Sequence, residues 1–103
     1  MVSVVMTTTS GEDEASHIAD VLVGDRYAAC AHILPRIESV YWWEEKMQRD
    51  EESVLIVKTT KRKVESVIKK IKELHTYEVP EIIAFESSNA CEVFEKYVLE
   101  EVK

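Results

Sequence analysis

The point at which one central helix must stop constrains the fold of this chain more than any other feature of its sequence. Apolar residues at helical spacing lead up to that point: Val64, Val67, Ile68, Ile71 and Leu74. Pro80 then excludes a continued helix and favours an extended backbone at Val79, because proline lacks an amide hydrogen and crowds the residue before it. A helix must therefore give way to a strand between His75 and Glu81, in a segment that carries an imidazole, a phenol and two carboxylates.

Further strands and helices alternate around this stop in an order that defines the fold class. Short apolar, β-branched segments predict strands over residues 2–8, 27–43, 53–59 and 82–85. Helical spacing predicts helices between residues 10 and 24 and over about 62–74, and a last helix that carries Phe94, Tyr97, Val98 and Val102. This β-α-β-β-α-β order with an added C-terminal helix is typical of the ferredoxin-like split βαβ arrangement, an α+β fold with an antiparallel sheet.

Local signals refine this order. Pro35 cannot donate to a ladder in mid-strand, so the 27–43 strand should bulge there or lie at a sheet edge. The charged segment 44–50 contains the reversal that joins this strand to the next as a protruding hairpin. Ser10, with Asp13 three residues later, predicts the cap of the first helix. Since 103 residues with two glycines and two prolines leave little material for linkers, we predict a single domain over residues 1–103.

A sheet of this kind has one face without helices, and the chain is expected to self-associate. The 27–43 strand carries Tyr41, Trp42 and Trp43 near its end. Long apolar edge strands are liable to aggregate unless a partner covers them. A homo-oligomer is therefore expected.

Charge and composition exclude several classes of partner. The formal net charge is −7, from 20 acidic and 13 basic side chains, so phosphate backbones and anionic membranes are repelled and no nucleic-acid or membrane role is expected. Seven basic residues fall between Lys58 and Lys72, which indicates either a local anion site or, as we prefer, a solvated helix face. Two cysteines, no recognisable leader and no long apolar run predict a cytoplasmic protein.

The segment between the central helix and its following strand is the richest in chemical groups. His75, Glu78 and Glu81 supply the nitrogen and oxygen donors that a transition metal accepts. Two alternatives need no ligand: His75 can meet the negative end of the helix dipole, and Glu81 can pair with a nearby basic residue. From these residues alone, we prefer the structural interpretation of His75 and Glu81 to the metal-binding one.

Two other groups of residues have both a functional and a structural interpretation. Cys30 and His32 share one strand face and could bind copper or zinc, but a cysteine among alanines is more often a packing residue. Trp42 and Trp43 could stack on a planar ligand or fill a subunit interface. Alternation places Tyr41 and Trp43 on one face of the strand and Trp42 on the other.

Blocks of residues along nearly the whole chain carry a more specific signal through their order and spacing. They are Ala29-Cys30-Ala31, Ile33-Leu34-Pro35, residues 39–44, Lys58-Thr59 and residues 75–82. Together they resemble the CutA divalent-cation tolerance family. The resemblance implies a ferredoxin-like subunit that forms a tight homotrimer through its edge strands, similar to the trimer of PII signalling proteins, with clefts between subunits. Since this family has no accepted catalysis, we expect that the protein is not an enzyme.

The resemblance also implies a metal. The site proposed for bacterial members of the family combines a cysteine on the first strand with adjacent histidines. This chain has Met6-Thr7-Thr8 on the first strand and Leu74-His75 before the turn, so His75 alone carries over as a metal ligand. A single imidazole predicts weak binding of Cu²⁺ or another divalent cation, completed by Glu78, water or a neighbouring subunit.

The alternative function is a PII-like sensor or scaffold whose inter-subunit cleft binds a small organic or anionic ligand. The residues expected to line this cleft are Cys30, Tyr41, Trp43, Lys58, Tyr77, Glu78 and Glu81. A third interpretation is an enzyme that uses Cys30 or Tyr77 with His75 and a carboxylate. The sequence supplies the functional groups of such an enzyme, but it does not predict that they assemble into an active site. We therefore place this interpretation last.

Overall fold

The strands and helices of the protein follow one another in the predicted order. The computed structural model describes all residues from 1 to 103. Its elements are β1 (Ser3–Thr9), α1 (Glu12–Gly24), β2 (Cys30–Trp43), β3 (Lys46–Thr59), the short 3-10 helix η1 (Lys61–Lys63), α2 (Val64–Leu74), β4 (Ile82–Glu86) and α3 (Glu92–Glu101). The strand order is β2-β3-β1-β4 with every neighbouring pair antiparallel, which confirms the ferredoxin-like split βαβ fold.

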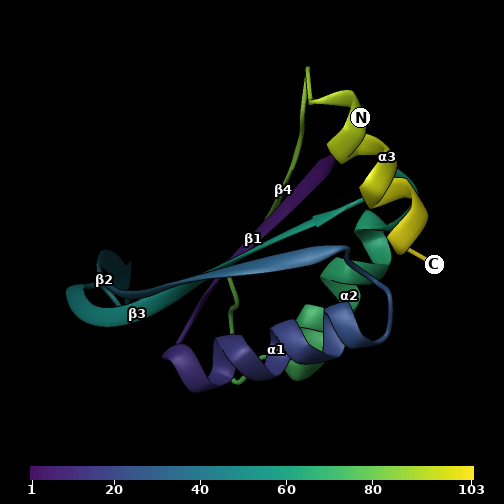
Figure 1. The fold of residues 1–103 in the computed structure, drawn as a ribbon. Helices are drawn as coiled ribbons and strands as arrows, with labels where there is room; N and C mark the ends of the chain where they lie inside the picture. Colours follow the sequence, from purple (N-terminus) through teal and green to yellow (C-terminus); the bar gives the residue numbers. More distant parts are fainter.

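One face of the sheet holds the main core. Figure 1 shows α1 and α2 together on one side of the sheet. Alternate residues of β1 and β3 are buried beneath these helices, so Val5, Leu55 and Val57 pack with Ile18, Leu22, Val67 and Ile71. A smaller cluster joins α3 to the start of the chain through Val2, Ala29, Val98 and Val102. None of the helices is long and apolar enough to cross a membrane.

The opposite face of the sheet has no helix over it and is apolar. The register places Met6 between Ile56 and Ile83, and Val4 beside Phe85. Leu34, Ile83 and Phe85 remain 45%, 43% and 49% exposed. This open face is the surface on which the expected self-association depends.

The irregularity expected at Pro35 is present. The register between β2 and β3 shifts between Leu34 and Ile37, and β2 lies at the edge of the sheet, so both features predicted from Pro35 are confirmed. Arg36 has a positive φ of 51° in the bulge. Beyond the bulge, β2 and β3 continue as a two-stranded ribbon that projects away from the helices (Figure 1).

The reversal expected within residues 44–50 is present, at Glu44 and Glu45. Two other predicted details were wrong. β3 begins at Lys46 rather than at residue 53. Charged residues fit these strands because both faces of a projecting ribbon meet solvent. The first helix begins after Gly11, which makes no side-chain cap, and Ser10 bonds to Glu14 instead of capping through Asp13.

Candidate functional site

A cleft of about 570 Å³ lies between the β2–β3 ribbon and the turn that follows α2. We call it the ribbon cleft. Its lining includes four aromatic residues, Tyr41, Trp42, Trp43 and Tyr77, and three acidic residues, Glu52, Glu78 and Glu81. Thr8, Ser39, Val40 and Val79 complete the lining, which contains no lysine or arginine. The cleft therefore presents aromatic rings and negative charge together.

The fold brings together some of the predicted site residues and separates others. Tyr41, Trp43, Tyr77, Glu78 and Glu81 all line the ribbon cleft. Cys30 and Lys58 face each other across β2 and β3, outside the lining of the cleft. Lys58 is six residues along β3 from the cleft residue Glu52, a separation of about 20 Å in an extended strand. Within one chain, these two residues take no part in the cleft.

The phenol of Tyr77 is held in place from two sides. Its hydroxyl donates to Glu52 Oε2 at 2.5 Å, and its ring centroid lies 4.8 Å from that of His75. Burial and the hydrogen bond to the Glu52 carboxylate raise the pKa of Tyr77 well above its ordinary value. The phenol therefore stays protonated near neutral pH and acts as a hydrogen-bond donor, not as a base or nucleophile.

His75 lies behind the cleft wall with its side chain fully buried. Its Nε2 lies 2.7 Å from the carbonyl oxygen of Thr8, and because a carbonyl only accepts, this contact assigns the ring proton to Nε2. Its Nδ1 accepts the backbone N–H of Tyr77 at 3.2 Å. Both nitrogens are thus used within the chain, and a metal at His75 would have to displace the Tyr77 amide.

The turn is anchored by Glu14, a residue that the sequence did not single out. Its Oε2 accepts the backbone N–H of Thr76 at 2.8 Å and the Thr76 hydroxyl at 2.7 Å, while its Oε1 accepts the N–H and hydroxyl of Ser10. Burial alone would raise the pKa of Glu14, but these hydrogen bonds lower it to about 2. The four-residue spacing from Ser10 to Glu14 is the only local signal for this role.

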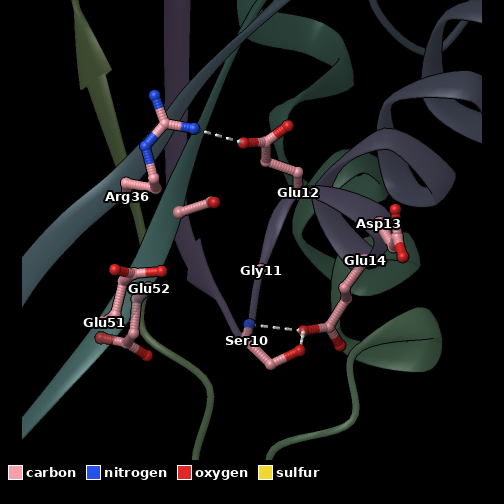
Figure 2. A pocket seen from close by; sticks show the side chains of 9 residues that line it. Ser10, Gly11, Glu12, Asp13, Glu14, Arg36, Glu51 and Glu52 are labelled. Carbon is pink, nitrogen blue, oxygen red and sulfur yellow. Dashed lines mark hydrogen bonds and ion pairs between the residues drawn. The ribbon is translucent and has the colours of Figure 1, made fainter.

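A second cavity, of about 530 Å³, separates the start of α1 from the ribbon. We call it the acidic pocket, because its lining includes Glu12, Asp13, Glu14, Glu51 and Glu52 and no apolar side chain. Figure 2 shows Arg36 reaching from β2 towards Glu12, to which it pairs at 3.5 Å, with Glu51 and Glu52 on the ribbon side. Nowhere in the chain do three or more histidine, cysteine or acidic side chains converge as a metal site.

Glu52 lines both the ribbon cleft and the acidic pocket, and the sequence did not indicate it. It is only 8% exposed, and the Tyr77 hydroxyl is the one side-chain donor that it receives. No lysine, arginine or histidine of the chain forms an ion pair with it. Thr60 Oγ1 is the only buried side-chain polar atom without a hydrogen-bond partner, so the second carboxylate oxygen of Glu52 keeps contact with solvent.

Comparison with known proteins gives the family of the chain. The family model described as CutA1 divalent ion tolerance protein matches residues 3–101. The chain belongs to the CutA1 family. This confirms the resemblance carried by the blocks from Ala29 to Ile82, which lie within the matched residues.

CutA proteins of several organisms are similar to the chain. The divalent-cation tolerance protein CutA of Thermus thermophilus is 42% identical over 84 residues, 82% of each chain, and that of Pyrococcus horikoshii 35% identical over 100 residues, 97% of each. The solved CutA1 structures from Thermus thermophilus and Oryza sativa both align with a TM-score of 0.95, at 35% and 32% identity. These alignments cover 100% of each chain for the first, and 99% of this chain and 94% of the other for the second. The chain spans only 46% of the length of the chloroplastic CutA 1 of Oryza sativa, to which it is 41% identical.

Proposed function

We propose that this CutA1-family protein is a non-enzymatic, cytoplasmic homotrimer that binds divalent cations in the ribbon cleft. The observation that carries the proposal is the composition of the cleft: three carboxylates and no basic side chain, in a chain of net charge −7. Such a lining attracts cations and repels anions. The family description, divalent ion tolerance, names the same class of ion.

The donors in the cleft favour a hydrated ion over one bound in a closed protein cage. Glu52, Glu78 and Glu81 offer carboxylate oxygens, but they are not part of any group of three converging donors. An ion held by one or two carboxylates keeps much of its water, as hard divalent cations commonly do. Copper bound through His75 requires a rearrangement in which Nδ1 exchanges the Tyr77 amide for the metal. Binding is therefore weak.

The homotrimer is supported by the uncovered face of the sheet. Leu34, Ile83 and Phe85 form an apolar surface, and β2 and β4 are both unpaired edges that a neighbouring subunit can extend. Light scattering after gel filtration should return three times the chain mass of 11.9 kDa. A mass close to that of a single chain at micromolar concentration would contradict the proposed assembly.

Separate observations support two other parts of the proposal, the absence of catalysis and the cytoplasmic location. Tyr77 stays protonated because its pKa is raised, and Cys30 lies outside the cleft, so neither supplies a nucleophile there. Both cysteines, Cys30 and Cys91, are free, as in a reducing compartment. Relatives carry other locations in their names: the Oryza sativa protein is called chloroplastic and an Archaeoglobus fulgidus structure periplasmic.

Calorimetric titration of the full-length protein with Mn²⁺ and with Cu²⁺ tests the proposal. Glu52→Gln removes the charge of the buried cleft carboxylate. Binding of either ion should weaken about tenfold, because the ion loses one negatively charged oxygen ligand. Glu51→Gln is the matched control, because Glu51 is the adjacent, exposed carboxylate and does not line the cleft. Equal binding by wild type and Glu52→Gln would remove the cleft from cation binding.

His75→Ala separates the two possible ligands. If His75 binds copper, this variant should lose Cu²⁺ and keep Mn²⁺, because the copper ion depends on the imidazole nitrogen and Mn²⁺ on the carboxylates. Unchanged Cu²⁺ affinity in the variant would remove His75 from the role and leave the carboxylates as the ligands.

A further inference from the structure

The solvent side of the helical run formed by η1 and α2 carries positive charge in an otherwise acidic molecule. We propose that this surface is a docking site for an acidic peptide segment of a partner protein. We call the surface the basic face and define it by Lys61, Arg62, Lys69 and Lys72. The inference does not depend on the proposed function, because the ribbon cleft contains no lysine or arginine.

The first argument is the concentration of charge. Residues 61–74 contain six basic and two acidic side chains, a charge of +4 in a chain of net charge −7. The other 89 residues therefore carry a charge of −11. A cluster of one sign creates a local field that attracts groups of the opposite sign, and here the attracted group is an anion.

The second argument is that the charges of the basic face are not used within the chain. Its four residues are exposed and form no ion pair. The other two basic residues of the run have intramolecular contacts: Lys70 pairs with Glu73 at 3.2 Å, and the Lys63 ammonium lies 5.1 Å from the centroid of the Tyr27 ring. Glu65 is the only acidic residue of the run without an ion pair. Most of the positive charge is therefore available to a partner.

The third argument is the position of three of these charges against the helix dipole. Acidic residues are favoured at the start of a helix, and α1 and α3 follow this rule with three and two of them in the first turn. The turn that leads into α2 is Lys61-Arg62-Lys63 and has no acidic residue. The local sequence therefore opposes the dipole, and an acidic partner placed there is attracted by both the side chains and the helix.

The basic face stays accessible in the proposed homotrimer. Helices α1 and α2 lie together on one side of the sheet, and the open face is on the other side (Figure 1). Assembly through the open face leaves the basic face in contact with solvent.

The surroundings of the basic face favour a short acidic peptide over a membrane or a nucleic acid. The apolar side of α2 is packed into the core through Val67 and Ile71, so the helix has no apolar face to insert into a bilayer. No exposed residue of the run is aromatic, so bases have no ring on which to stack. A lipid surface or a long nucleic acid would also meet the acidic remainder of the chain.

The size of the surface fits such a peptide. The 14 residues from Lys61 to Leu74 span about 21 Å as a helix. An extended peptide covers about 3.3 Å per residue, so about six or seven residues reach from one end of the run to the other. A segment of this length does not need to touch the acidic parts of the chain.

Fluorescence anisotropy of a dye-labelled peptide of eight glutamates tests the inference on the full-length protein. The anisotropy should rise to a plateau as protein is added, and a peptide of eight glutamines with the same dye should show no rise. Salt screens charges over about 10 Å near 0.1 M, so raising NaCl from about 20 to about 150 mM should weaken binding at least tenfold. Absence of binding at the lower salt concentration, equal binding of the two peptides, or binding that salt does not weaken would overturn the inference.

A triple variant tests the surface itself. Lys61→Gln, Lys69→Gln and Lys72→Gln together remove three charges from the basic face and should weaken binding of the glutamate peptide at least tenfold. Glutamine forms helices about as well as lysine, so the thermal unfolding of the variant should match that of the wild type.

The matched control is a second triple variant, with substitutions at three exposed lysines that lie elsewhere and form no ion pair: Lys46→Gln, Lys96→Gln and Lys103→Gln. Both triple variants have a net charge of −10, three lower than the wild type. The control should weaken binding less than threefold. An equal loss in the two variants would show that binding follows net charge, and would overturn the inference.

Two competitors test the other classes of partner. Vesicles of phosphatidylserine with phosphatidylcholine, and a single-stranded RNA of ten uridines, should leave the glutamate peptide bound. Displacement of the peptide by either competitor at a lower charge concentration than that of the unlabelled glutamate peptide would overturn the inference, because the basic face would then prefer a membrane or a nucleic acid.

Discussion

Two turns lie beside the ribbon cleft, and the protein holds them in opposite ways. The turn after α2 is bonded to three other parts of the chain: His75 to Thr8, Thr76 to Glu14 and Tyr77 to Glu52. The turn at the tip of the ribbon consists of Glu44 and Glu45 alone, with φ angles of 50° and 64° and no side-chain hydrogen bond. One wall of the cleft is therefore rigidly placed, while the other depends on a strained two-residue reversal.

This difference indicates a division of roles. The α2–β4 turn fixes Tyr77, and through it the Glu52 carboxylate, before any ligand arrives. The ribbon carries Tyr41 and Trp43 on β2, which beyond the bulge pairs only with β3. Elements with few contacts open most easily, so we expect adjustment to a ligand on the ribbon side.

The largest effect should come from breaking the anchor of the rigid turn. Glu14→Ala removes the acceptor for Ser10 and Thr76, whose four hydrogen bonds to a charged group are each worth more than a neutral one. We expect a loss of about 3 kcal/mol in the free energy of unfolding, measured in urea at fixed protein concentration. Asp13→Ala, one residue earlier and exposed, is the control, and an equal loss in both variants would contradict the anchoring role of Glu14.

The same anchor should respond to acid in a defined direction. The Glu14 pKa falls from 4.5 to about 2 on folding, so as the pH drops the unfolded chain takes up the proton first. The contribution of Glu14 is therefore complete above about pH 5 and is lost between 4.5 and 2. The difference in unfolding free energy between wild type and Glu14→Gln should shrink as the pH falls from 5 to 2, and a constant difference would show that the charge is not the cause.

A smaller loss is expected where the rigid turn meets the cleft. Tyr77→Phe removes the hydroxyl that donates to Glu52 and leaves a largely buried carboxylate without its donor, at a cost of about 2 kcal/mol. Tyr41→Phe is the comparison on the ribbon side, because its partner Asp50 is exposed and keeps its solvent. Urea unfolding should rank Tyr77→Phe as the more damaging change, and the reverse order would break the contrast between the two walls.

The smallest effect should be a gain at the ribbon tip. Glu45→Gly relieves a side chain held in the left-handed region, where glycine is free of the clash that other residues meet, and should stabilise the fold by about 1 kcal/mol. Gln48→Gly, at a ribbon position without positive φ, should destabilise it. If thermal unfolding shows a loss for Glu45→Gly as well, the turn is not strained in the way its φ angles indicate.

Much of the fold followed from local patterns. The apolar spacing from Val64 to Leu74, the strand-like segment around Val54 and the stop at Pro80 were sufficient to place the elements in order, and Pro35 indicated both the bulge and the edge. The start of β3 was missed because charged residues in a solvent-exposed ribbon carry no apolar alternation. The cap at Ser10 was misassigned because Glu14, one turn into α1, competes with Asp13 for the same donors.

Less of the candidate site could be predicted from local sequence patterns. Tyr41, Trp43, Tyr77, Glu78 and Glu81, which we expected in a cleft between subunits, line one cleft within the single chain. Cys30 and Lys58 were expected in the same cleft. A family pattern records neither which chain of an assembly a residue comes from nor how far along a strand it lies, so the pattern could not separate these two residues from the others. Glu52 was missed because, within its charged segment, nothing distinguishes the one glutamate that β3 buries at 8% exposure.

The sequence by itself determined the alternation of strands and helices, the net negative charge, the family and the dense polar turn after α2, since each depends on composition or on residues close in the chain. Only the tertiary structure decided which groups meet. Thr76 and its anchor Glu14 are 62 residues apart, and Tyr77 and Glu52 are 25 apart. These contacts depend on strand register and on how α1 packs beside α2, which no local propensity encodes. That packing buries the His75 side chain and gathers the aromatic and acidic residues of the ribbon cleft.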